Sequence, residues 1–311
     1  MKKTLKKRAF ISAIAMLIVS AIVLTSSTFA WFAMATQVSV DTMDLTITSL
    51  DGIVFSANTT NWTTKLSTTD ITNTQSSTYR YGAYEGNKNN IPTELAPVST
   101  LFSVSNEFPT FYSGSIDNNG LCTVSKATSG GNCADDVGRK FVAFDLFIKL
   151  ATATTVTWNS TLSVNEGDLK DAMYAMRVGI VYCGTVTEKA KSDEILPKRG
   201  AGNAVATVWE MDTTKHGATS GVEDGTELIT QPMAAATQLN LGTGHVVTKE
   251  DVIKSGVFCN FATRDTAKTI AAPKGVTKLR VYIWLEGQDV DCDSAIAGSI
   301  VKCGLSFSIN G

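Results

Sequence analysis

The sequence predicts an all-β protein: an antiparallel, jelly-roll-like β-sandwich with long inserted loops and an N-terminal signal segment. Apolar and polar residues alternate with a period of two in several long segments. Long helical periodicity is scarce, threonine is abundant, and only six of the 311 residues are prolines. Many alternating strands with few helices are typical of sandwiches and jelly rolls.

The first 30 residues are typical of a secretory signal peptide. Residues 1–8 carry five positive charges and no acid, residues 9–24 are apolar, and a small-residue stretch ends at Ala30. We expect cleavage between Ala30 and Trp31 and therefore a secreted, extracellular or cell-surface location. The alternatives are a second cut within residues 33–35 and an uncleaved anchor, because the apolar run is close to the minimum length for a membrane span.

The first strands are predicted on either side of an Asp-Gly pair. Segments 38–40 and 43–47 alternate out of phase with each other, which indicates a bulge near Asp41–Thr42. Asp51–Gly52 separates the apolar run that ends at residue 50 from a second run over 53–56. This pattern predicts a β-hairpin.

Further strands and loops follow from the same alternation. Residues 57–90 are a polar excursion, and residues 113–138 form a second loop. Residues 168–172 are compatible with one helical turn. The remaining strands are predicted at 141–150, 156–162, 176–182, 204–211, 278–285 and 301–309.

Six cysteines in an exported chain predict disulfides. The candidates are Cys122, Cys133, Cys183, Cys259, Cys292 and Cys303. We expect Cys122 to pair with Cys133 across a glycine-rich loop, and we consider the pairs Cys183–Cys259 and Cys292–Cys303. Buried free thiols are the alternative.

Composition excludes several function classes. With 27 basic and 29 acidic side chains the formal net charge is -2, unlike that of a basic nucleic-acid binder. The two histidines, His216 and His245, lie outside any zinc-protease motif, and there is no serine-nucleophile or phosphate-loop pattern. We therefore expect no enzymatic activity and no nucleic-acid partner.

One acidic loop is the candidate metal site. Asp289, Asp291 and Asp293 alternate, as at the start of a calcium loop. An EF-hand is excluded, because Ser294 stands at the sixth position and Ile300 at the twelfth. Calcium is the one cofactor that the sequence suggests, and a solvated acidic turn is the alternative.

The expected new N-terminus begins with two aromatic residues, Trp31 and Phe32, which are costly to expose. They either pack into this chain's own core or begin a strand, through Val38 and Val40, that adds to an open sheet edge of a neighbouring subunit. Strand donation in one direction would propagate into a filament. The expected partners are further copies or other surface proteins, and a signal peptidase during export.

Residues 28–32 and Met43–Leu45 resemble the start of proteins of the TasA/camelysin family, which are exported by Gram-positive bacteria and matured by a SipW-type signal peptidase. The resemblance covers about residues 1–50, and residues 283–292 also resemble surface proteins of that bacterial group. It implies a jelly-roll sandwich whose freed N-terminal strand joins the next subunit in biofilm fibres. The six cysteines depart from the family, and no zinc motif supports the peptidase activity attributed to some relatives.

The sequence therefore divides into a signal peptide (1–30), an N-terminal strand (31–50) that either packs in its own chain or is donated to a neighbouring subunit, and a β-sandwich domain (51–311). The expected function is that of a secreted structural protein, a biofilm-matrix or fibre subunit that assembles by β-strand addition. The alternative is a cell-surface adhesin that binds glycans or host protein through its long loops and aromatics such as Trp62 or Tyr112. Membrane contact is expected only through an uncleaved signal segment.

Overall fold

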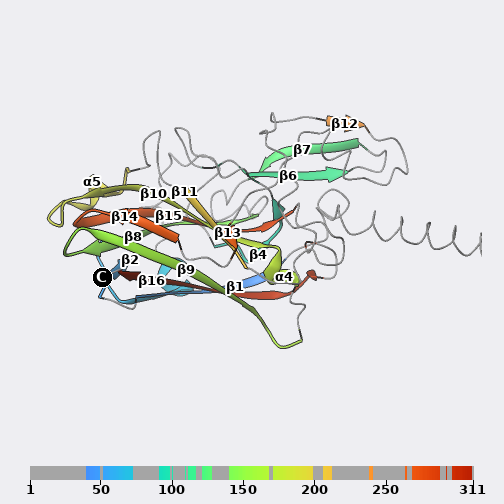
Figure 1. The fold of residues 1–311 in the computed structure, drawn as a ribbon. Helices are drawn as coiled ribbons and strands as arrows, with labels where there is room; N and C mark the ends of the chain where they lie inside the picture. Colours follow the sequence, from blue (N-terminus) through green and yellow to red (C-terminus); the bar gives the residue numbers. More distant parts are fainter. Residues whose placement is uncertain are drawn as a thin grey trace, which may run out of the picture.

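A computed structural model describes residues 40–49, 52–72, 91–98, 100, 109, 111–116, 121–127, 140–167, 171–198, 206–211, 238–240, 263–264, 268–287, 292 and 296–309. Over these ranges the protein is mostly β, as predicted, with two multi-stranded sheets, a smaller third sheet and three short helices (Figure 1). No helix within the ranges is long and apolar enough to cross a membrane.

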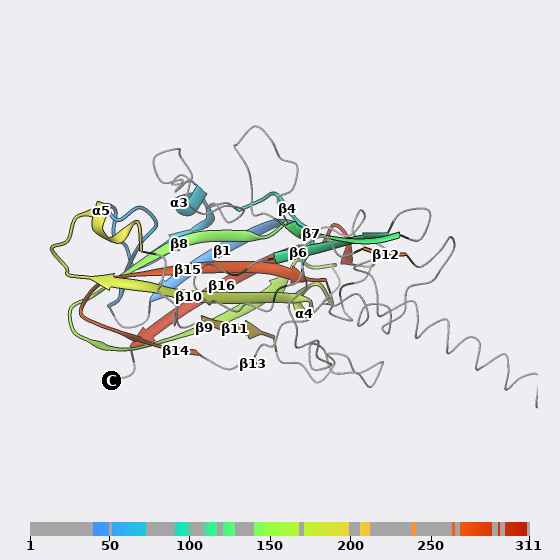
Figure 2. The ribbon, with the colours of Figure 1, turned by 90° about the horizontal axis from the view of Figure 1, so that it is seen from above.

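The first large sheet, sheet A, has the strand order β14-β9-β16-β1-β3, and β4 also pairs with β1. Its strands are β1 (Val40–Ser49), β3 (Lys65–Ser67), β4 (Glu94–Leu95), β9 (Thr154–Val164), β14 (Lys268–Ala272) and β16 (Ile300–Ile309). The first and last strands of the described chain therefore lie side by side (Figure 2).

The second large sheet, sheet B, has the order β13-β11-β10-β15-β8-β2, and β5 also pairs with β15. Its strands are β2 (Val54–Ser56), β5 (Pro97–Val98), β8 (Val142–Leu150), β10 (Met176–Val186), β11 (Ala206–Glu210), β13 (Thr263–Arg264) and β15 (Gly275–Glu286). The long strands β10, β15 and β8 form its centre.

A third sheet, in the order β12-β7-β6, lies above one end of the other two in Figure 1. It contains β6 (Phe111–Ile116), β7 (Leu121–Ala127) and β12 (Gln238–Asn240), and the helices are α3 (Thr68–Thr72), α4 (Asp171–Tyr174) and α5 (Ser192–Ile195). The loop predicted over 113–138 is thus partly wrong, because its first half is the antiparallel pair β6–β7. The helical turn expected at 168–172 overlaps α4, which begins at Asp171, while residues 168–170 lie outside the described residues.

Sheets A and B share one hydrophobic core, to which both contribute alternate side chains. The predicted inward faces are confirmed for β8 (Val142, Phe144, Leu146, Ile148, Leu150), β15 (Leu279, Val281, Ile283, Leu285) and β16 (Val301, Cys303, Leu305, Phe307). The period of two alone was sufficient to identify these buried faces.

Strand pairing is not wholly antiparallel, which corrects the expectation. Parallel pairs are formed by β1 with β16, β11 with β13 and β15 with β5. Each joins strands that are far apart in the sequence, so no tight hairpin dictates their relative direction.

The hairpin predicted at Asp51–Gly52 is wrong, because β1 lies in sheet A and β2 in sheet B. Gly52 does have the positive φ that such a turn needs, +74°, but here the turn carries the chain from one sheet to the other. This crossing lets Ile47 and Phe55 enter the same core from opposite sides. The bulge predicted near Asp41–Thr42 is confirmed by a register shift between Asp41 and Asp44.

Candidate functional site: the seat of strand β1

Strand β1 is hydrogen-bonded along both edges. On one side it runs parallel to β16, from Asp41 opposite Ile300 to Ser49 opposite Phe307. On the other side its two ends pair with β3 and β4, which leaves a gap around Leu45 between them. The backbone of β16, β3 and β4 therefore forms a seat for β1.

The inward side chains of β1 fill the core at this seat. Leu45 is 1% exposed and Ile47 is 0% exposed, and they lie opposite Cys303 and Leu305 in the parallel register. Asp44, Thr46 and Thr48 alternate with them and point to the outer face of sheet A, where Asp44 is exposed. Burial of Leu45 and Ile47 is the main source of attraction between β1 and its seat.

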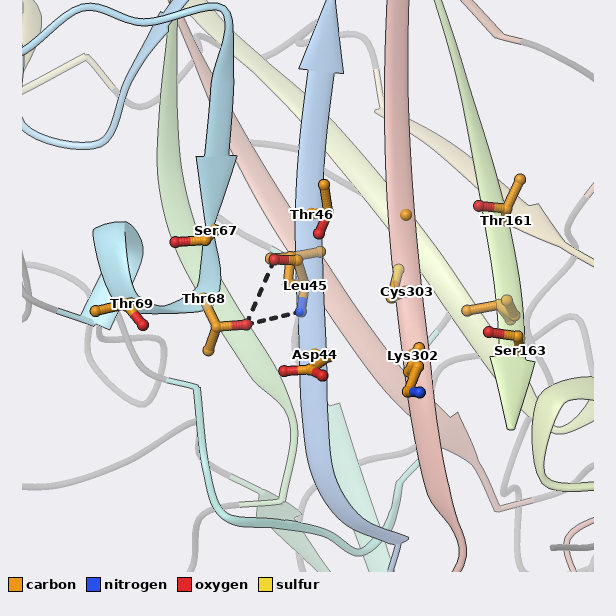
Figure 3. A pocket seen from close by; sticks show the side chains of 12 residues that line it. Asp44, Leu45, Thr46, Ser67, Thr68, Thr69, Thr161, Ser163, Lys302 and Cys303 are labelled. Carbon is orange, nitrogen blue, oxygen red and sulfur yellow. Dashed lines mark hydrogen bonds between the residues drawn. The ribbon is translucent and has the colours of Figure 1, made fainter. Parts of the chain in front are cut away.

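A threonine hydroxyl closes the gap between β3 and β4. The Leu45 amide donates to Thr68 Oγ1 at 2.7 Å, and the same hydroxyl donates to the Leu45 carbonyl oxygen at 3.4 Å (Figure 3). One side chain thus serves both backbone groups that a neighbouring strand would have served. Thr68 is the first residue of α3, so this helix fixes the edge of β1.

The turn before α3 is itself held by a carboxylate. Asp70 Oδ2 accepts hydrogen bonds from the Ser67 amide at 2.8 Å and the Ser67 hydroxyl at 2.7 Å. These two bonds hold the pKa of Asp70 below its usual value, with the hydroxyl as the larger cause. The ionised form of Asp70 therefore favours the turn that places Thr68 against Leu45.

The outer face of sheet A is hollowed beside β1, with a volume of about 470 Å³. Its floor and walls come from β1, β16, β9, β3 and α3 (Figure 3). The lining residues are Asp44, Leu45, Thr46, Ser67, Thr68, Thr69, Thr161, Leu162, Ser163, Lys302, Cys303 and Gly304. Hydroxyl groups therefore dominate the polar surface of the hollow.

Two of the expected disulfides are not formed. Cys183 and Cys303 are buried free thiols, which excludes the pairs Cys183–Cys259 and Cys292–Cys303. Each of the two lies within a long strand, with its side chain packed among apolar residues. Cys133, Cys259 and the side chain of Cys122 lie outside the described residues, so the pair Cys122–Cys133 stays a prediction.

Burial controls the chemistry of both thiols. It raises the pKa of Cys303 to about 12, against which a contact with the Ser160 hydroxyl at 3.7 Å has a smaller, opposite effect. Burial likewise raises the pKa of Cys183 to about 12, with a further contribution from the Asp145 charge. Both therefore remain protonated at neutral pH and are poor nucleophiles.

A second group of polar residues lies on the other side of sheet B, away from the shared core. Asp145 Oδ1 contacts Arg280 at 2.9 Å and its Oδ2 contacts Lys278 at 3.3 Å, with these side chains 0–3% exposed. Arg177 and Glu210 form another buried pair at 2.9 Å. Lys278 Nζ also donates to the Leu196 carbonyl at 2.6 Å.

These charges were not identified as partners from the sequence. Asp145 faces Arg280, and Arg177 faces Glu210, on adjacent antiparallel strands. Burial lowers the pKa of Lys278, although the nearby Asp145 charge opposes this shift. The charges pair with one another in the interior, and Asp145–Arg280 and Arg177–Glu210 join residues that are register partners on neighbouring strands.

Most residues of the sequence-predicted sites lie outside the described ranges: Ala30, Trp31, Phe32, Val38, Asp289, Asp291 and Asp293. Val40 is the first residue of β1, though only its backbone is described. Within the described ranges, no three metal-ligating side chains come together. The calcium site therefore stays a prediction.

Of the two aromatics suggested for ligand contact, only the side chain of Trp62 is described. Its indole N–H donates to the Thr59 carbonyl at 3.2 Å, and Lys149 Nζ lies 4.6 Å from the ring centre. The ring face is thus occupied by a cation from this chain.

Comparison of the chain with protein-family models, with curated proteins and with solved structures gives no match.

Proposed function

We propose that the protein is a secreted structural surface protein, a biofilm-matrix or fibre subunit with a jelly-roll-like sandwich fold, whose copies join by exchanging strand β1. The observation that carries this proposal is the place of β1. It is an interior strand of sheet A, yet it belongs to the N-terminal end of the chain and pairs with the C-terminal strand β16.

Two of the three elements that form the seat of β1 have other anchors. Strand β16 pairs with β9 from Val301 to Ile309, and β3 follows a bridge between Phe55 and Thr63. The part of the seat formed by β16 would therefore persist without β1, with an open edge on β16 and uncovered apolar side chains. Such an edge is a template for another strand.

A β1 strand from a second copy would restore the same contacts. Leu45 and Ile47 would enter the same core, and Thr68 would bind the incoming Leu45 backbone. Exchange replaces each contact of β1 within its own chain by the identical contact with a second copy. Its main requirement is therefore that the chain around Gly52, which crosses between the sheets, becomes extended. If each copy gives its strand to the next and receives one from the previous copy, the contact does not close and a fibre forms.

A disulfide lock tests the exchange. Thr48 and Ser306 are partners in the β1–β16 register, so the variant Thr48→Cys/Ser306→Cys can cross-link the two strands. When the variant is oxidised as a monomer, before assembly, it should stay monomeric in electron micrographs and form filaments only after reduction. Oxidised after assembly, it should give a ladder of linked subunits on a non-reducing gel.

The matched control is Thr155→Cys/Ala271→Cys, which links the register partners on β9 and β14 and leaves β1 untouched. It should assemble when oxidised and give only monomers on the gel. Filaments from the pre-oxidised β1 lock, or assembled protein without a ladder, would refute strand exchange. So would an unlocked protein that stays monomeric.

A further inference from the structure

We propose that the hollow on the outer face of sheet A binds a neutral saccharide unit of one or two sugar rings. This goes beyond strand exchange, because it assigns a ligand to a surface that the assembly of β1 does not itself use. The observations are the chemistry of the lining, its charge balance and its size.

The lining offers hydroxyl groups from three sides. Thr46 lies on β1, Thr69 lies in α3, and Thr161 and Ser163 lie on β9 (Figure 3). The hydroxyl of Ser67, the last residue of β3, already donates to Asp70. A hydroxyl group both donates and accepts hydrogen bonds. A ring of such groups therefore matches a ligand that itself carries several hydroxyl groups.

The charges in the hollow balance. Asp44 and Lys302 are register partners on β1 and β16, and both side chains are exposed. Among the described residues, neither belongs to an ion pair; the ion pairs there join the buried charges on sheet B. A carboxylate can accept from two neighbouring hydroxyls and an ammonium can donate to a third. One charge of each sign favours a neutral ligand over an anion or a cation.

The shape of the hollow depends on a glycine. A Cβ at Gly304 would lie 2.6 Å from Thr161 Oγ1, so only glycine at this position lets the Thr161 hydroxyl lie against the backbone of β16 without displacement. The volume of about 470 Å³ falls in the usual range of ligand sites, about 300–1,000 Å³. The apolar lining residues, Leu45, Leu162 and Cys303, are at most 6% exposed. An apolar peptide side chain would therefore find no anchor.

The site spans the joint between β1 and its seat, since Asp44 and Thr46 come from β1 and Lys302 comes from β16. If the proposed exchange occurs, the walls come from two subunits, and a bound sugar would stabilise the filled seat by mass action. This last consequence rests on the proposed function, whereas binding itself does not.

The test is an amide-detected NMR titration of the Thr48→Cys/Ser306→Cys protein, oxidised so that β1 stays in its own seat. The probes are cellobiose, maltose, lactose and diacetylchitobiose, each to about 20 mM, because wet polar sites of this kind bind in the millimolar range. Sodium glucuronate is the charged probe. We expect at least one neutral disaccharide to shift amides confined to 44–46, 67–69, 161–163 and 302–304.

Three variants sharpen the result. Asp44→Ala should weaken binding of that disaccharide at least tenfold and Lys302→Ala several-fold. Thr269→Ala, at an exposed site on β14 outside the hollow, should leave it unchanged. The proposal is overturned if no neutral probe gives confined shifts, if neither charged variant weakens binding, or if only glucuronate binds and does so through Lys302 alone. Because β1 is locked, these outcomes are independent of whether strand exchange occurs.

Discussion

The outer faces of the two large sheets differ sharply, although their strands alternate in the same way. On sheet A, strand β9 alternates between buried residues and exposed or half-buried residues, which are mostly threonine and serine. On sheet B, all twelve residues of β15 are buried, including Lys278, Arg280 and Glu286. Alternation thus identifies the inner face of a strand but does not reveal whether the other face meets solvent.

Charged side chains on the two outer faces also differ in solvent exposure. On sheet A, Asp44 and Lys302 stand in solvent, where screening makes each of little consequence for stability. On sheet B, Asp145 and Arg280 are nearly inaccessible and touch at 2.9 Å. We therefore expect a carboxylate beside a basic side chain to be dispensable for the fold on the outer face of sheet A and needed on that of sheet B.

The largest expected difference between the faces appears when one carboxylate is removed from each in turn. Asp145→Ala leaves Lys278 and Arg280 buried without their shared anion, and we expect it to lower the free energy of unfolding by about 3–5 kcal/mol. Asp44→Ala on sheet A should change it by less than about 0.5 kcal/mol. Urea denaturation of both variants measures the difference. Equal effects would show that the outer face of sheet B is as wet as that of sheet A.

The next effect is a loss of stability at high pH. Cys183 lies on the outer side of sheet B and Cys303 in the shared core, yet burial raises the pKa of both to about 12. The folded protein holds these protons more tightly, so the contribution is complete below the unfolded thiol pKa and is lost as the pH rises toward 12. At pH 10 we expect about 1–2 kcal/mol less stability for each thiol.

Urea denaturation measured from pH 7 to pH 10 gives the slope of the free energy of unfolding against pH. Cys183→Ala and Cys303→Ala should each reduce the slope by a similar amount, whatever their cost at pH 7. A reduction for Cys303→Ala only would mean that water reaches the outer side of sheet B.

A smaller effect is expected at the edge of β1. Thr68→Val removes the hydroxyl that serves Leu45, and an unsatisfied backbone amide costs about 1–2 kcal/mol. The Leu45 amide should also exchange its hydrogen faster, because its hydrogen bond to the Thr68 hydroxyl is lost. Thr69→Val, the exposed neighbour, is the control. Unchanged exchange at Leu45 would mean that Thr68 does not close this edge.

The smallest effect tests the floor of the hollow. Gly304→Ala places a methyl group against Thr161 Oγ1, and we expect a cost of about 1 kcal/mol. The double variant Gly304→Ala/Thr161→Ala should recover most of it, which a double-mutant cycle in urea would show. Additive effects would mean that the two residues do not interact.

The inner faces of β8, β15 and β16 and the bulge in β1 could be predicted from the sequence, because they depend on local periodicity. The parallel partner of β1 could not, since nothing in residues 40–49 specifies a strand that begins at Ile300. The Asp51–Gly52 pair misled for a related reason: its positive φ suits a crossing between sheets as well as a hairpin.

The buried charges could have been suspected from the sequence but not paired. Asp145 interrupts the apolar strand 142–150, and Lys278 and Arg280 interrupt 276–285. Opposite charges within two strongly apolar strands are the signal of a cross-strand pair. Thr68 carries no such signal, because its role depends on where α3 packs against Leu45.

The side-by-side arrangement of β1 and β16 sets an order of events when the protein is made. Synthesis and export both deliver β1 before β16, so β1 must wait for most of the chain before its own partner is available. During that delay its free edges are open to a β16 from a chain already finished. Local crowding of nascent and completed molecules, rather than stability alone, would then decide which partner arrives first.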